Sequence, residues 1–204
     1  MRSLLIGILS LVSFGFLDAQ EDIRQVDFKN FTYPLSGTLL GHDRLHWLNM
    51  QRGAHSNRKP IHLVNGDDLT KLSSLVKDGH EYIQWGGFTL QSVEFADVTG
   101  EGKEDAIVVL KCFTGGTQKT HYVYIYSFHE GKPKLLACFH SGDRAWSGLR
   151  KVYGENGKLV VELFDPEKRS GDCCSSGIVR TRYKWHKGHF EAFGAPETVA
   201  LQEP

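Results

Sequence analysis

Nine residues near the middle of the chain carry oxygen-bearing side chains at regular spacing around two glycines. They read DVTGEGKED and cover residues 97–105. Calcium loops place oxygen ligands at alternate positions around a sharp glycine turn, and Gly102 stands at the sixth position of this stretch. The candidate ligands are Asp97, Thr99, Glu101 and Asp105, with the main-chain carbonyl of Lys103 at the seventh position. This pattern predicts a calcium site.

The same nine residues are also typical of a hairpin loop that holds no ion, and this interpretation is the favoured one. In that interpretation the Asp97 carboxylate turns the backbone by accepting hydrogen bonds, and the glycines adopt positive φ. Lys103 would then help to neutralise the acidic side chains. Both interpretations predict one strand on each side of the loop.

The wider stretch SVEFADVTGEGKEDAIVVL, residues 92–110, resembles the calcium-loop segment of FG-GAP and VCBS blades, whose loop runs D-x-N-x-D-G-x-x-D between two strands. The residues that carry the match are Asp97, Gly100, Gly102 and Asp105. Thr99 and Glu101 depart from the pattern, and one copy is present where a propeller needs several blades. The rest of the chain resembles an uncharacterised secreted bacterial protein family. The resemblance implies a strand-loop-strand unit and calcium as its ligand.

Two polar loops offer further side chains for binding or catalysis. In the stretch 141–152, Asp143, Arg144 and Trp146 lie between two predicted strands, a combination typical of sugar or peptide binding and also of a structural loop. The stretch 41–60 contains His42 and His46, which could supply a general base in a small secreted hydrolase. Neither H-E-x-x-H nor G-x-S-x-G accompanies these histidines.

Residues 1–19 are typical of a secretory signal peptide. Arg2 precedes the apolar run LLIGILSLVSFGF, and Ala19 supplies a small residue at the cleavage end. We therefore expect a secreted or periplasmic protein whose cysteines meet an oxidising compartment. The four cysteines are Cys112, Cys138, Cys173 and Cys174. They allow three pairings, and a bond from Cys112 to one of the adjacent pair is favoured over a bond within that pair.

Bulk properties exclude two classes of partner. Lys and Arg together number 24, as do Asp and Glu, so the formal net charge is zero and no basic field for nucleic acid exists. After residue 19, no segment is apolar for the length that a membrane span requires. The chain length suits a single domain with an N-terminal segment.

From residue 88 to residue 194 the chain is expected to form an antiparallel β domain. AIVVLKCF is a continuous apolar run, typical of a strand buried on both faces, and IVRTRYKW alternates apolar with basic residues. HYVYIYSF places three tyrosines and a phenylalanine on one face. Tight turns are predicted at HEGKP, ENGK and HKGH, each with a glycine between two strand-like runs.

Outside this domain, residues 20–87 are predicted to form a loop and a short helix, and residues 195–204 a flexible tail. DDLTKLSSLVKDG carries Leu69, Leu72 and Leu75 at helical spacing, with Gly79 as a stop. The predicted fold is therefore mostly β: an antiparallel meander sheet, or a partly closed barrel or sandwich, of about seven or eight strands with one short helix. The leading function is a secreted, non-catalytic binding or structural domain. A calcium-stabilised module and a small secreted hydrolase are the alternatives.

Overall fold

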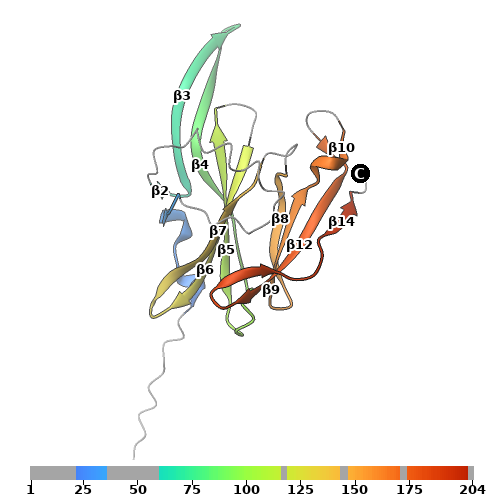
Figure 1. The fold of residues 1–204 in the computed structure, drawn as a ribbon. Helices are drawn as coiled ribbons and strands as arrows, with labels where there is room; N and C mark the ends of the chain where they lie inside the picture. Colours follow the sequence, from blue (N-terminus) through green and yellow to red (C-terminus); the bar gives the residue numbers. More distant parts are fainter. Residues whose placement is uncertain (1–21, 36–59, 116–118, 143–146, 171–173, 202–204) are drawn as a thin grey trace, which may run out of the picture.

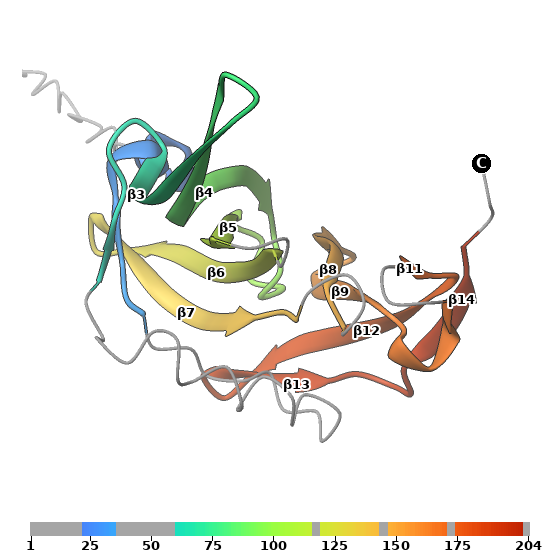
Figure 2. The same ribbon diagram turned by 90° about the horizontal axis from the view of Figure 1, so that it is seen from above.

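The computed structural model describes residues 22–35, 60–115, 119–142, 147–170 and 174–201. These residues are mostly β, and their two main sheets are antiparallel and five-stranded. The sheets form two layers that meet at one end of the molecule and diverge toward the other (Figure 1). The view from above shows the two sheets side by side, with the first sheet strongly curled (Figure 2). The mostly β, antiparallel class expected from the sequence is confirmed.

The first sheet has the strand order β3-β4-β5-β6-β7, so each strand pairs with its neighbour in sequence. Its strands are β3 (Asp67–Lys77), β4 (His80–Ala96), β5 (Asp105–Thr114), β6 (Lys119–His129) and β7 (Lys132–His140). A meander of this kind needs only short hairpin connections, which agrees with the glycine turns in the sequence.

The second sheet has the order β13-β12-β9-β8, and β14 pairs with β12 beside this path. Its strands are β8 (Leu149–Glu155), β9 (Lys158–Phe164), β12 (Gly177–His186), β13 (His189–Ala192) and β14 (Glu197–Ala200). The remaining elements are short: η1 (Ile23–Gln25), η2 (Phe28–Asn30), β1 (Thr32–Tyr33), β2 (Ile61–His62), η4 (Pro166–Lys168), β10 (Arg169–Ser170) and β11 (Cys174–Ser175).

Apolar side chains from both sheets form one core between the layers. Ile107 and Val123 of the first sheet and Val161 of the second are almost fully buried there. The opposite face of the first sheet carries a second core, which the N-terminal segment covers. The ring of Tyr33 lies 4.9 Å from that of Tyr124 in a tilted contact, and the Tyr33 hydroxyl donates a 2.7 Å hydrogen bond to the carbonyl of Phe28. Strand β5 is thus buried on both faces, as its continuous apolar run predicts.

The helix predicted over residues 67–79 is wrong, because these residues form β3 and the following turn. β3 pairs with β4 along its whole length, from Asp67 opposite Thr89 to Lys77 opposite His80. Asp78 and Gly79 both have positive φ, as a tight hairpin turn requires. Asp-Gly is one of the strongest hairpin signals, and it outweighed the leucine spacing. The hairpin projects beyond the body of the sheet as an arm, residues 69–85 (Figure 1).

Two other predicted boundaries differ from the structure. Residue 88 is no domain boundary, because β4 runs through it without interruption. Residues 197–200, within the predicted flexible tail, form β14 and pair with Gly177–Arg180 of β12. The local sequence gives no strong signal for either feature, because each segment forms a strand by pairing with a strand elsewhere in the chain.

The three glycine turns predicted within the β domain are confirmed. Each has a non-glycine residue followed by glycine, both with positive φ: Glu130-Gly131, Asn156-Gly157 and Lys187-Gly188. These turns join β6 to β7, β8 to β9, and β12 to β13. Two consecutive residues with positive φ give a backbone twist that matches that of the flanking strands.

The outer face of the second sheet carries a network of ion pairs. Glu162 on β9 is 2% exposed and accepts hydrogen bonds from the guanidinium groups of Arg150 and Arg180, the latter at 2.8 Å. Arg182 continues the network with a 2.6 Å bond to Glu197 of β14. The basic residues of β12 that alternate with apolar ones therefore face carboxylates on neighbouring strands.

Candidate functional site

The loop of residues 97–105 is closed by hydrogen bonds from its own backbone. Asp97 accepts from the amides of Gly100 at 2.6 Å and Gly102 at 2.9 Å, one with each carboxylate oxygen. Both glycines have positive φ. This arrangement is the one that the ion-free interpretation predicts, with Asp97 turning the backbone through its side chain.

Asp105 stabilises the other end of the same loop from inside the protein. It is 1% exposed, and its Oδ2 accepts from the amides of Val98 at 3.1 Å and Thr99 at 3.2 Å. Burial raises the pKa of Asp105, and the hydrogen bonds from these amides oppose the rise without cancelling it. Its Oδ1 is buried and finds no hydrogen-bond partner among the described residues.

The loop connects β4 to β5 of the first sheet, and it also packs against the second sheet. Val98 is fully buried in the core between the layers. Gly100 lies against the β8–β9 turn, where a Cβ on Gly157 would come within 3.3 Å of its Cα. On β8, a Cβ on Gly154 would approach the Cβ of Ala96 to 2.4 Å, so only glycine fits beside it. The stretch that the sequence singled out for chemistry thus holds the closed end of the sandwich together.

The ligands proposed for calcium do not converge in this loop. Glu101 and Lys103 are exposed, whereas Asp105 is buried and turned toward the Val98 and Thr99 amides. The described residues contain no group of three or more His, Cys, Asp or Glu side chains that could hold a metal ion. The calcium site therefore stays a prediction, and the hydrogen bonds that Asp97 and Asp105 accept from the loop backbone favour the ion-free interpretation.

The other predicted site residues fall largely outside the described chain. Asp143, Arg144 and Trp146 lie outside it, as do His42 and His46. Cys112 and Cys138 are buried, and no disulfide joins described residues. The position of Cys173 and the side chain of Cys174 are outside the description, so the pairing of Cys112 with one of them stays a prediction.

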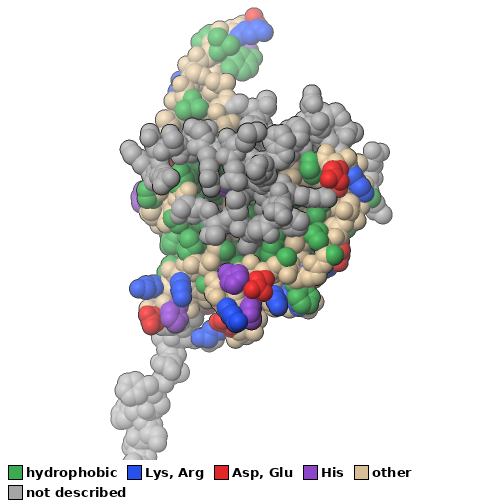
Figure 3. Space-filling view, viewed as in Figure 1, with side chains coloured by type: hydrophobic (Ala, Val, Ile, Leu, Met, Phe, Trp, Pro, Cys, Tyr) green, Lys and Arg blue, Asp and Glu red, His purple; other side chains and the backbone are tan. Residues whose placement is uncertain are grey.

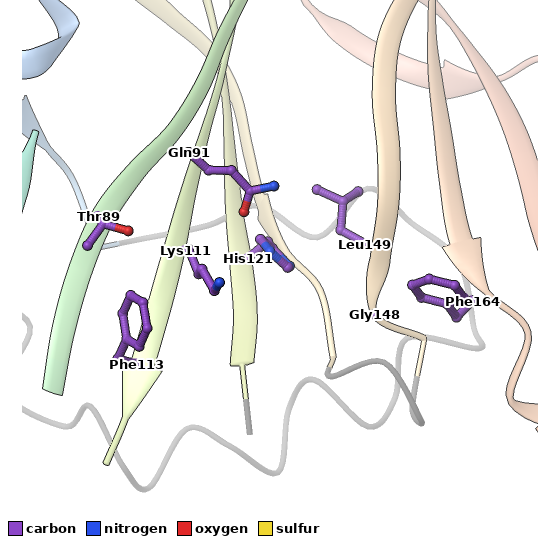
Figure 4. A pocket seen from close by; sticks show the side chains of 8 residues that line it. All are labelled: Thr89, Gln91, Lys111, Phe113, His121, Gly148, Leu149 and Phe164. Carbon is purple, nitrogen blue, oxygen red and sulfur yellow. The ribbon is translucent and has the colours of Figure 1, made fainter. Parts of the chain in front are cut away.

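A cleft opens where the two sheets diverge. Its volume is about 530 Å³, and β4, β5 and β6 form one wall while β8 and β9 form the other. Figure 4 shows Gln91, Lys111 and His121 projecting from the first sheet toward Leu149 and Phe164 of the second. The complete described lining is Thr89, Gln91, Lys111, Phe113, His121, Gly148, Leu149 and Phe164.

Strand register brings three of these polar side chains into one row. Thr89 on β4 lies opposite Lys111 on β5, which in turn lies opposite His121 on β6. Residues directly opposite each other in antiparallel strands project to the same face. On that face the apolar core ends at Val109 and Val123, and the polar row follows two residues further along each strand.

His121 is held in place through its backbone and carries an unused ring nitrogen. Its amide donates to the Ser141 hydroxyl at 3.2 Å, and its carbonyl accepts from the Ser141 amide at 2.8 Å. Burial lowers the pKa of His121, and the positive charge of Lys111 lowers it further, so the ring is neutral at physiological pH. Its Nδ1 is buried and has no hydrogen-bond partner among the described residues.

The chemistry of this lining is that of an anion site with apolar walls. Lys111 brings a positive charge, Thr89 and Gln91 bring hydrogen-bond donors, and no described lining residue is acidic. Leu149 and Phe164 face these polar groups from the other sheet, and the Lys111 ammonium lies 5.4 Å from the ring centre of Phe113. The sequence does offer one signal for this site, because Lys111 interrupts the apolar run AIVVLKCF.

Hydrophobic side chains also gather on the projecting arm (Figure 3). Its exposed apolar residues are Leu69, Leu72, Leu75, Val76, Tyr82, Ile83 and Trp85, each more than a third exposed. Single exposed apolar residues are ordinary, whereas several on the two faces of one projecting hairpin are typical of an interaction surface.

Comparison with protein-family models, curated proteins and solved structures found no match. Among the described residues, no helix has the length and apolar character that crossing a membrane requires. The geometry of the described residues therefore carries the functional argument.

Proposed function

We propose that this protein is an exported, non-catalytic binding domain that holds a small organic anion in the cleft between its two sheets. The observation that carries the proposal is the row Thr89–Lys111–His121, which places one ammonium group at the base of a cleft with no acidic residue in its described lining. Export is the expectation from the signal-like residues 1–19.

A carboxylate is the anion that this lining suits. The Lys111 ammonium would donate a charge-assisted hydrogen bond to one oxygen. The Gln91 amide and the Thr89 hydroxyl supply further polar contacts, and the His121 ring lines the same cleft. Apolar walls beside a few convergent polar groups are typical of small-molecule sites.

Binding rather than catalysis follows from what the cleft brings together. Nucleophilic catalysis needs a nucleophile beside a base that a third group orients. His121 is the one described imidazole in the lining, and neither a cysteine nor a carboxylate stands beside it there. Its neighbour Lys111 repels a proton from the ring, which opposes the imidazolium that general-base catalysis forms.

Thermal shift and calorimetry with short carboxylates, such as acetate and butyrate, test the proposal. We expect a rise in melting temperature with ligand concentration, because the ligand binds the folded state alone. Lys111→Met keeps the length of the side chain, removes its charge and should weaken binding at least tenfold, since hydrogen bonds to charged groups contribute about 1.5–3 kcal/mol. Lys132→Met, at the exposed start of β7, is the matched control. Equal binding by the two variants would show that the cleft is not the site.

A further inference from the structure

The cleft continues as a second cavity on the arm. This second cavity has a volume of about 380 Å³ and is lined by Leu69, Ile83, Gln84, Trp85, Phe113 and Gly115. Phe113 lines both cavities, so the apolar surface passes without interruption from the Lys111 row to the arm. The two cavities differ in chemistry, because a lysine and a histidine line the first and no charged residue is in the described lining of the second.

Strand register explains why the surface is hollow between the two cavities. Leu69 on β3 lies opposite Gly87 on β4, and Gly87 lies opposite Phe113 on β5. Gly87 has a φ of +123°, and a Cβ there would lie 2.0 Å from the carbonyl oxygen of Asp68. The backbone therefore requires glycine, and the row has two large apolar side chains with no side chain between them.

The same face of the arm presents further apolar groups in line with this hollow. Trp85 is 45% exposed and Ile83 39% exposed. They stand two and four positions before Gly87 in the sequence. Alternation along β4 puts them on the face of Thr89 and Gly87. The Lys111 ammonium lies 5.4 Å from the ring centre of Phe113, which stands opposite Gly87. From Gly87 to Ile83 the strand runs about 13 Å, a length that an extended chain of roughly a dozen carbon atoms spans.

We infer that the ligand is an aliphatic carboxylate with a long unbranched chain, whose head group binds Lys111 and whose chain lies across Phe113 against Leu69, Trp85 and Ile83. This inference rests on the proposed function, because it places the carboxylate in the same cleft. Charge complementarity fixes the direction of the ligand: the positive charge lies at one end of the continuous surface, and the other end is apolar.

A series of carboxylates of increasing chain length tests this ligand class. Acetate, butyrate, octanoate and dodecanoate are titrated by calorimetry, each below the concentration at which it forms micelles. Full burial contributes about 0.8 kcal/mol per methylene, or nearly a fourfold gain in affinity, and partial burial on an open groove about twofold. Equal affinity across the series would overturn the inference and leave the proposed function intact. Absence of binding by every member would overturn both.

Two variants on the same hairpin distinguish ligand binding in the groove from ligand binding on the opposite face of the arm. Ile83 faces the groove, and its neighbour on the other face, Tyr82, pairs with Leu75, which is 64% exposed. Ile83→Ser should weaken dodecanoate binding about tenfold and leave butyrate binding unchanged, while Leu75→Ser should leave both unchanged. Equal losses in the two variants would show that the chain does not follow the groove.

Fluorescence quenching locates the aliphatic chain of the bound ligand without a measurement of affinity. A dodecanoate brominated near its methyl end should quench Trp85, and a Trp85→Phe variant identifies that contribution among the four tryptophans of the chain. Sedimentation at the same concentrations tests whether a second copy covers the arm instead. If Ile83→Ser converted a dimer to a monomer and left dodecanoate affinity unchanged, the groove would be an interface between copies and the inference would fail.

Discussion

Lys111 on β5 and His121 on β6 lie directly opposite each other in the row of polar side chains at the base of the cleft. The positive charge of Lys111 adds to burial in lowering the pKa of His121 below its ordinary value of 6.5. A bound anion between the two groups would act in the opposite direction, because it stabilises the imidazolium. Ligand binding and protonation of His121 should therefore be linked.

Carboxylate affinity is accordingly expected to rise as the pH is lowered. Above the His121 pKa of the complex, affinity is constant. It then rises as the pH falls and levels off below the pKa of the ligand-free protein, with about a tenfold gain for each pKa unit that separates the two states. Calorimetry with butyrate from about pH 8 to about pH 5.5 measures this. His121→Gln should flatten the profile, whereas His129→Gln, at the exposed end of β6, should not.

Asp97→Ala should destabilise the protein by about 1–2 kcal/mol, because it leaves the Gly100 and Gly102 amides without their acceptor. Glu101→Ala, at an exposed position of the same loop, should have little effect. Denaturant unfolding measures both. Since hydrogen bonds close the loop, the melting temperature is expected to be the same in EDTA and in millimolar calcium. A calcium-dependent rise that Asp97→Ala abolishes would instead identify a metal loop.

Gly154→Ala should destabilise the closed end of the sandwich by about 1–3 kcal/mol, as overpacking of a core does. The added methyl group would meet the Cβ of Ala96 at 2.4 Å. The double variant Ala96→Gly/Gly154→Ala removes that contact and should recover part of the loss. A double-mutant cycle with no coupling energy would contradict the close approach of β4 and β8.

Glu162→Gln should destabilise the second sheet by about 1–3 kcal/mol, because it leaves two arginines without their shared carboxylate. Burial raises the pKa of Glu162, but hydrogen bonds from Arg180 and Arg150 outweigh burial and hold the pKa below its ordinary value. The stabilisation is therefore complete above the unfolded-state pKa and is lost as the pH falls through the folded-state pKa. Unfolding free energies measured from neutral to acidic pH should converge for the two proteins. A difference that stays constant with pH would exclude this charge effect.

Local sequence features predicted the strands of the β domain and their turns. Asn156-Gly157 is one case: both residues accept positive φ, and the hairpin forms around them. The helix over residues 67–79 shows the limit of this reasoning. Leu69, Leu72 and Leu75 have helical spacing, yet pairing with β4 gives their segment a strand conformation. Intrinsic preferences over a few residues are small compared with the hydrogen bonds of a long strand pair.

The site itself depends on contacts between residues far apart in the chain. Thr89, Lys111 and His121 form one row only because β4, β5 and β6 pair in a particular register, and a shift of one residue would turn each side chain to the opposite face. The sequence alone thus determined the β class, the strand periodicity and the hairpin turns, since these depend on backbone preferences within a few residues. The tertiary structure decided that the 97–105 loop joins two sheets and that Lys111 lies in a cleft, because burial and register depend on which distant strands pack together.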